Sequence, residues 1–410
     1  MAPTRQHPSP GAALTAFALV WGNLGALAFA AVPLTLLLAA SFLGPRAWRA
    51  AAGATAVWAL WVALGPKPHV RGSLGRAAWR RFSESFFGFA LMRTYLGLTL
   101  EVDPATKALP LETPVVLALH PHGVLSDTRV LVDGLLYKAL PGRSVLSLAA
   151  SVLFALPVVR RVALWTRCID ASRSVAQRAL AQGHSLLVLP GGEREQFQTQ
   201  RGVESVYLAR RRGFLRLALA SGARVCPCYS FGAAELYDTY KGPAPLYKLR
   251  RWLMRACRVC VPLFTGALGT FAPRAVRQTI VVGPPVALTD AEVAAAAAAA
   301  GGSSGSSGAA AARAANAKKL LSGRADGHTY DKGYSKWEKF DVDAACAEVD
   351  AGGCGNAGFG GVTTDGTKET KEVGEAALAK AHERYVAALR KLFDAHKGRL
   401  GYGDRELVVV

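Results

Sequence analysis

Two histidines flank a proline at residues 120–123 (His-Pro-His-Gly), directly after the apolar run 114–119. Asp127 follows His122 at H-x-x-x-x-D spacing, which can return a carboxylate to an imidazole across one helical turn or a tight loop. Such a carboxylate fixes the tautomer of the ring, so that the other ring nitrogen can accept a proton. The pattern indicates a general base at His122, although both histidines could equally be structural residues at a strand end.

A second motif, Leu-Pro-Gly-Gly-Glu-Arg-Glu, spans residues 189–195. Consecutive glycines after a strand let backbone N–H groups approach a ligand closely, as an oxyanion hole or a phosphate cradle requires. Gly191 and Gly192, with Gly123 of the first motif, are the candidates for that role; a plain turn is the alternative. Glu195 is a second candidate for the carboxylate that serves the histidine pair.

Arginines follow the glycine motif closely, in the segment 209–222. Arg211, Arg212 and Arg216 form a basic edge on a predicted apolar helix and could hold phosphate groups, although a solvated surface is the common alternative. A second basic run at 248–258 is more typical of a membrane-facing or solvated surface than of catalysis. The chain as a whole carries a net charge of +20 with 51% hydrophobic residues, which favours a membrane surface over DNA as its anionic partner.

The motifs that the sequence lacks also narrow the chemistry. It has no G-x-S-x-G nucleophile elbow, no P-loop and no G-x-G-x-x-G fingerprint, so direct base catalysis without a covalent intermediate fits best. Of the seven cysteines, Cys226 and Cys228 lie within a predicted apolar strand, and Cys257 and Cys260 are three residues apart. Reduced cytosolic thiols explain these pairs better than zinc does, so no metal is expected.

The elements that must position these residues form a predicted α/β domain over 67–290. Its clearest strands are 114–119, 185–189, 224–231 and 278–282, each a short apolar or β-branched run. Three of them end in the polar or glycine-rich sequences HPHG, PGGERE and FGAAE. Because sites in open α/β sheets form at the carboxyl ends of strands, these three ends predict one shared cleft.

Residues 1–66 are predicted to be a tail and a transmembrane helical hairpin. The stretch 12–45 has 34 residues without an ionisable side chain, too long for one straight span of a core about 30 Å thick. A second uncharged run, 50–66, would form the other arm. The basic cluster at 67–81 normally stays on the cytoplasmic side, so the α/β domain is expected in the cytosol.

Two further segments follow the α/β domain. Residues 291–372 are rich in Ala, Gly and Ser and are interpreted as a flexible insertion, with a regulatory or partner-binding arm as the alternative. Residues 373–410 contain apolar side chains at helical spacing (HERYVAALRKLFDAHK) and should form an amphipathic helix and a strand that pack on the α/β domain.

Taken together and in order, the motifs HPHG, LPGGEREQF and ESVYLARRRGFLRLALASGARVCPCYSFGAAELY resemble the type-2 diacylglycerol acyltransferases. The resemblance covers about residues 12–290 and 375–410. It implies a glycerolipid-acyltransferase-like α/β sheet flanked by helices. It implies His122 as the general base, with His120 completing the motif, and Glu195 as the family's acid after the paired glycines. Two departures stand out: Ala233 replaces the usual Glu or Gln, and Asp127 is not part of the family pattern.

The resemblance also implies a reaction, the transfer of a fatty acyl group from coenzyme A to diacylglycerol at the endoplasmic reticulum membrane or lipid droplets. Acyl-CoA would be a co-substrate, with no cofactor, and Arg211, Arg212 and Arg216 would hold its phosphates. Monoacylglycerol or a fatty alcohol could be the acceptor instead, and a non-catalytic acyl-CoA-binding protein of lipid droplets is the alternative outside catalysis. No nucleic-acid module is recognisable, so no nucleic-acid partner is expected. A homo-oligomer is left open.

Overall fold

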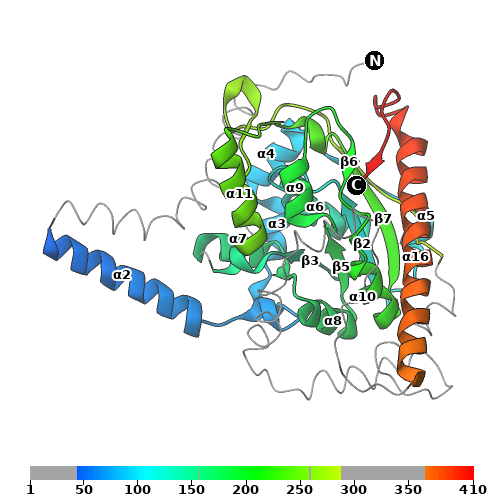
Figure 1. Ribbon diagram of the computed structural model, residues 1–410, viewed down its shortest axis with the longest axis horizontal. Helices are drawn as coiled ribbons and strands as arrows, with labels where there is room; N and C mark the ends of the chain where they lie inside the picture. The colour runs from blue at the N-terminus through cyan, green and yellow to red at the C-terminus, as the bar shows by residue number, and fades with distance from the viewer. Residues whose placement is uncertain (1–43, 156, 258–259, 288–364) are drawn as a thin grey trace.

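A computed structural model of the protein describes residues 44–155, 157–257, 260–287 and 365–410. A seven-stranded sheet forms its centre, in the order β1-β10-β7-β2-β5-β3-β4 (Figure 1). The strands are β1 (Thr99–Val102), β2 (Val115–His120), β3 (Val145–Ala149), β4 (Cys168–Asp170), β5 (Ser185–Val188), β7 (Arg224–Phe231) and β10 (Thr279–Val282). The predicted α/β class is confirmed, since β7, β2, β5, β3 and β4 pair in parallel. β10 departs from this direction: it pairs antiparallel with β7 and parallel with β1.

Alternate residues of β2 enter two separate hydrophobic cores, one on each face of the sheet. Val116 and Ala118 belong to a core shared with helices α8, α10 and α16, whereas Leu117 and Leu119 belong to a core shared with α4 and α6. Both faces are therefore covered, which explains why every residue of β2 is buried and why its sequence is a continuous apolar run. The helices include α3 (Arg80–Ser85), α4 (Phe87–Tyr95), α5 (Pro104–Lys107), α6 (Asp127–Ala139), α7 (Pro157–Trp165), α8 (Arg173–Ala181), α9 (Gly192–Gln198), α10 (Gly213–Ser221), α11 (Ala244–Cys257) and α16 (Asp365–Lys397).

The carboxyl-terminal segment packs on the sheet from far along the chain. Helix α16 runs along one side of the molecule, against β7 and α10 (Figure 1). After it, β11 (Val408–Val409) pairs with β6 (Ser205–Val206), and Arg405 lies 2.9 Å from Glu204 and 2.5 Å from Glu235. A second small sheet joins β8 (Asp238–Thr239) to β9 (Phe264–Thr265). The last 46 residues described therefore belong physically to the α/β body.

Helix α2 (Pro45–Leu64) projects from the body at the amino-terminal side (Figure 1). It contains most of the run 50–66, which the sequence predicts to be the second arm of a membrane hairpin. The helix is alanine-rich and begins with Arg46 and Arg49 in its first turns. Across the residues that the structure describes, α2 included, no helix combines the length and the apolar character needed to cross a bilayer. The first arm, 12–45, and the insertion 291–372 fall almost wholly outside the described residues.

Candidate active site

The two central motifs meet because their strands are neighbours. β2 and β5 run parallel with Ala118 opposite Val188, so the loops that follow them leave the same edge of the sheet. β7 lies on the other side of β2 in the same direction, which brings its carboxyl end to this edge as well. The convergence expected from parallel strand ends is therefore present in the fold.

Glu195, in α9, fastens three segments together from a buried position. Its Oε1 accepts a hydrogen bond from the backbone N–H of His122, and its Oε2 accepts one from the backbone N–H of Tyr207 at 2.7 Å. Burial would raise the pKa of Glu195, but the His120 ring and the His122 N–H outweigh burial and lower it. Glu195 is thus a carboxylate at neutral pH that holds the backbone of the histidine loop, not the His122 ring.

His120 is fully enclosed between the sheet and α16. Its Nδ1 lies 3.8 Å from Glu195 Oε2, and its Nε2 lies 3.2 Å from the hydroxyl of Tyr385. That hydroxyl also donates to the carbonyl of Ala118 at 3.3 Å. The ring is fully buried, and its Nδ1, at ion-pair distance from Glu195, has no hydrogen-bond partner among the described residues.

His122, two residues further on, is half-buried. Its Nδ1 is 3.0 Å from the carbonyl of Gly123, and the hydroxyl of Ser126 is 3.1 Å from Nδ1 and 3.0 Å from Nε2. Donation from Nδ1–H to the Gly123 carbonyl leaves Nε2 with its lone pair, the state a general base needs. Burial lowers the pKa of His122 below its ordinary 6.5, so the ring is neutral at pH 7.

Asp127 does not orient this ring. Among the described residues no hydrogen bond or ion pair joins it to His122; its Oδ2 accepts from the Tyr237 hydroxyl at 3.0 Å. The physical reason is the left-handed backbone of Ser126 (φ 56°), directly before α6. Because of it, residues 122–127 do not form a helical turn. Burial raises the pKa of Asp127 to about 6, against the opposing hydrogen bond from Tyr237. A backbone carbonyl, not either predicted acid, fixes the tautomer of His122.

The glycines have different constraints. A Cβ at Gly191 would lie 2.2 Å from the Glu195 carboxylate, so close packing excludes any side chain there. Gly123 (φ 68°) and Gly192 (φ 56°) adopt left-handed backbone. The Gly192 N–H already donates to the Leu189 carbonyl at 3.2 Å, whereas the Gly191 N–H donates to no acceptor in the described part of the chain. Of the three glycines predicted as oxyanion donors, Gly192 thus has its N–H engaged within the turn, whereas the N–H of Gly191 stays available in the described structure.

The arginines also divide into two kinds. Arg211 is tied to the glycine turn, with Nη2 3.3 Å from the Gly191 carbonyl and 3.4 Å from Glu193 Oε1. Arg212 and Arg216 are exposed at the start of α10, on the surface beside the turn. Of the three, Arg211 contacts the glycine turn, whereas Arg212 and Arg216 are exposed residues of the helix start.

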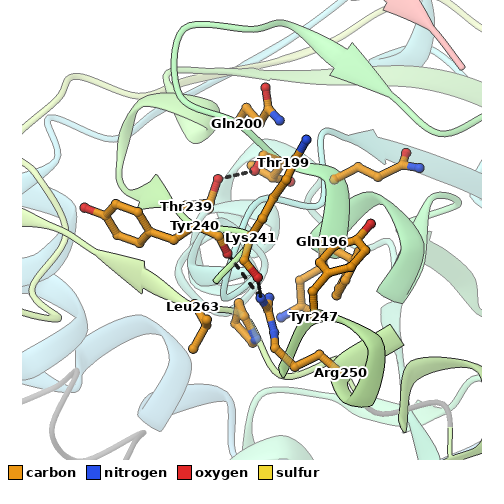
Figure 2. Close-up of a pocket in the computed structure, with 12 residues that line it drawn as sticks. Gln196, Thr199, Gln200, Thr239, Tyr240, Lys241, Tyr247, Arg250 and Leu263 are labelled. Carbon is orange, nitrogen blue, oxygen red and sulfur yellow. Dashed lines mark hydrogen bonds between the residues drawn. The ribbon is translucent and has the colours of Figure 1, made fainter. Parts of the chain in front are cut away.

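A cavity of about 250 Å³ lies further along α9, beyond Glu195 (Figure 2). It is lined by Gln196 and the residues after it, by the β8 strand region, and by Tyr247 and Arg250 of α11. None of the predicted catalytic residues lines it. Gln196 nevertheless couples the two places, because its side-chain amide donates to the Val124 carbonyl of the histidine loop.

No metal centre is visible in the described ranges, where no three His, Cys, Asp or Glu side chains are grouped as ligands. Cys226 and Cys228 are buried in β7, and burial raises the pKa of both thiols, to about 11 for Cys226. They are thiols packed in a core, which suits the interpretation of reduced structural cysteines.

Comparison with known proteins identifies the family of this chain. The family model described as "Diacylglycerol acyltransferase" matches residues 55–297, and the chain belongs to this family. Diacylglycerol O-acyltransferase 2 of Dictyostelium discoideum is 29% identical over 37% of this chain and 48% of its own length. Diacylglycerol O-acyltransferase 2B of Umbelopsis ramanniana is 30% identical over 42% and 53%, and acyl-CoA wax alcohol acyltransferase 2 of Mus musculus is 27% identical over 46% and 60%.

The chain thus spans about half the length of the curated relatives it matches. Among solved structures, the 1-acyl-sn-glycerophosphate acyltransferase of Thermotoga maritima is similar over 60% of this chain and 78% of its own, with 15% identity and a TM-score of 0.31. A superposition this loose carries no conclusion about the site.

Proposed function

We propose that this protein transfers a fatty acyl group from acyl-CoA to the hydroxyl of diacylglycerol, forming triacylglycerol at the endoplasmic reticulum membrane. Membership of the diacylglycerol acyltransferase family supports the reaction class. The observation that carries the chemistry is His122: a neutral, half-buried imidazole whose Nδ1 is held by the Gly123 carbonyl 3.0 Å away.

The reaction needs a base because an alcohol is a weak nucleophile. Nε2 of His122 takes the hydroxyl proton as the oxygen bonds to the thioester carbonyl carbon, a contribution of about 10² to 10⁴ in rate. The carbon–sulfur bond then breaks, and the coenzyme A thiolate receives the proton from the imidazolium. No covalent acyl-enzyme forms. The proton that His122 takes from the alcohol ends on the coenzyme A thiol, and the imidazole is neutral again for the next turnover.

Two neighbouring groups would serve the transition state and the donor. The Gly191 N–H could donate to the developing oxyanion, worth roughly 3 kcal/mol for a well-placed donor. The exposed guanidinium groups of Arg212 and Arg216 would attract the coenzyme A phosphates. Glu195 and His120 would act through the backbone, by fixing where His122 stands.

A second acceptor class has its own support. One of the matched relatives is named as an acyl-CoA wax alcohol acyltransferase, so a fatty alcohol is the second candidate acceptor. Membranes carrying the protein should be incubated with labelled acyl-CoA and, in turn, diacylglycerol, monoacylglycerol and a fatty alcohol. Triacylglycerol as the dominant product supports the proposal. A dominant wax ester would instead identify a fatty alcohol as the acceptor, and dominant diacylglycerol would identify monoacylglycerol.

The base is tested with His122→Ala in the same membranes. Transfer should fall by about 10² to 10⁴ while the protein remains membrane-associated. In the wild type, the acidic limb of the pH–rate profile should lie below pH 6.5, because the pKa of His122 is lowered. Unchanged transfer by His122→Ala, to any of the three acceptors, would remove His122 from the mechanism.

A further inference from the structure

The rotation of α11 about its own axis is fixed by contacts on its inner face. Arg250 is buried and donates to the carbonyls of Tyr240 at 3.1 Å and Lys241 at 3.0 Å (Figure 2), and to the carbonyl of Val261 at 2.6 Å. Met254, one turn further on, is buried as well. Arg250 and Met254 therefore fix one side of α11 against the protein. The opposite side of the helix faces outward.

The outward side of α11 carries large apolar residues at three-residue intervals. Leu246 is 38% exposed, Leu249 is 51% exposed and Trp252 is 60% exposed. Single exposed apolar side chains are ordinary, but three in one stripe of a helix are not. Tyr240 and Val261, whose carbonyls accept from Arg250 on the inner side of the helix, are exposed as well, but they are not part of this stripe.

Cations border this stripe. Lys248 and Arg251 are exposed on the same helix, and neither forms a hydrogen bond or an ion pair with any residue that the structure describes. On a helical projection at 100° per residue, Arg251 and Lys248 precede Trp252, and Leu249 and Leu246 follow it. The outer face therefore changes from basic to aromatic to aliphatic across its width.

We infer that the outer face of α11, residues 246–252, docks on the anionic phospholipid surface of a bilayer. Leucine and tryptophan would enter the headgroup boundary, and the two cations would stay among the lipid phosphates, the arrangement typical of helices that lie in the interface. Charge complementarity selects this partner over an apolar protein face, which would leave both cations without a counter-charge. The inference concerns a surface, and it stands or fails independently of the acyltransferase reaction.

Trp252 allows a direct test in the full-length protein. The chain is reconstituted into phosphatidylcholine–phosphatidylserine vesicles with brominated acyl chains, and the emission of Trp252→Phe is subtracted from that of the wild type. The difference spectrum isolates Trp252, which is exposed, so the substitution does not disturb the core. The inference expects this emission to be blue-shifted and strongly quenched by bromine, and less so in vesicles of phosphatidylcholine alone.

Charge variants sharpen the test. Lys248→Gln with Arg251→Gln should weaken docking about 25-fold, since each cation near an anionic surface contributes roughly fivefold. The matched control, Arg390→Gln with Lys391→Gln, removes two exposed charges from α16 on the other side of the molecule and should leave quenching unchanged (Figure 1). An unquenched Trp252, whether solvent-like or blue-shifted by a protein neighbour, would overturn the inference, as would equal loss in both pairs.

Discussion

The two histidines of the His-Pro-His-Gly loop are two residues apart and have opposite surroundings. His120 lies fully buried on the α16 face of the sheet, with Nε2 beside the Tyr385 hydroxyl and Nδ1 at ion-pair distance from Glu195. His122 is only half-buried, with one ring nitrogen held by the Gly123 carbonyl and the other beside the Ser126 hydroxyl. From this difference we expect the two histidines to have separate roles, His120 in holding the loop and His122 in the reaction.

The largest effect on this division is expected from Glu195→Gln. Each carboxylate oxygen accepts a backbone N–H, so an amide must turn its NH₂ toward one of those donors. We expect the free energy of unfolding to fall by about 2 kcal/mol and activity by roughly 100-fold, because the His122 loop shifts.

Chemical denaturation and single-turnover transfer measure both effects. Glu193→Gln, a half-buried neighbour on the same helix, is the control and should change stability by less than about 0.5 kcal/mol. Full activity in Glu195→Gln would show that the loop keeps its place without the carboxylate, and would break the distinction between holding and reacting.

Tyr385→Phe should have an intermediate effect. The missing hydroxyl leaves His120 Nε2 without a hydrogen-bond partner among the described residues, which should cost about 1 to 2 kcal/mol of stability. The value of kcat should fall by no more than about tenfold, and the KM for acyl-CoA should not change. The acidic limb of the pH–rate profile should stay at the same pH as in the wild type. A displaced acidic limb would mean that His120, not His122, titrates in the reaction.

Arg212→Gln tests the proposed phosphate-binding role of the exposed arginines at the start of α10. An exposed guanidinium that attracts coenzyme A phosphates should raise the KM for acyl-CoA about fivefold and leave kcat unchanged. Arg224→Gln is the matched control, because this exposed arginine begins β7 at the opposite end of the sheet. Equal effects of the two substitutions would assign both to general surface charge.

Asp127→Asn should have the smallest effect on activity, because among the described residues no hydrogen bond or ion pair joins Asp127 to the His122 ring. Its pKa is about 6 in the folded protein against 3.8 ordinarily, so the folded state binds the extra proton and stability falls as pH rises from 4 to 6. Asparagine does not ionise, so Asp127→Asn avoids this loss. It should raise the free energy of unfolding by about 1 to 2 kcal/mol at pH 7, less than the whole pKa shift would give, because the side chain is partly solvated. Thermal melts from pH 4 to 7 measure it; a large loss of transfer would restore Asp127 to the site.

The sequence was sufficient to predict what parallel strands determine. Because the carboxyl ends of β2 and β5 share an edge, the approach of Glu195 to the histidine loop followed from two motifs after two apolar runs. What it could not specify was the atom that each group contacts. The H-x-x-x-x-D spacing suggested an Asp127–His122 pair, but the left-handed backbone at Ser126 sends that carboxylate to Tyr237 instead.

Tyr385 escaped sequence reasoning for a different reason. It recurred at helical spacing in HERYVAALRKLFDAHK and was interpreted only as an apolar position, since nothing local ties it to a histidine 265 residues earlier. Its one signal was a hydroxyl within a buried stripe, which must find a partner. The antiparallel direction of β10 had no signal either, because a fully buried run has the same composition in both directions.

The docking of α16 has a consequence for synthesis. A nascent chain that has left the ribosome only as far as β10 has all seven strands of the main sheet, yet Tyr385 has not emerged and His120 has no hydroxyl partner. The loop that carries the reactive imidazole can settle only once the final helix closes over it. Acyl transfer would then begin as a late event of translation, after everything between residues 283 and 385 has been made.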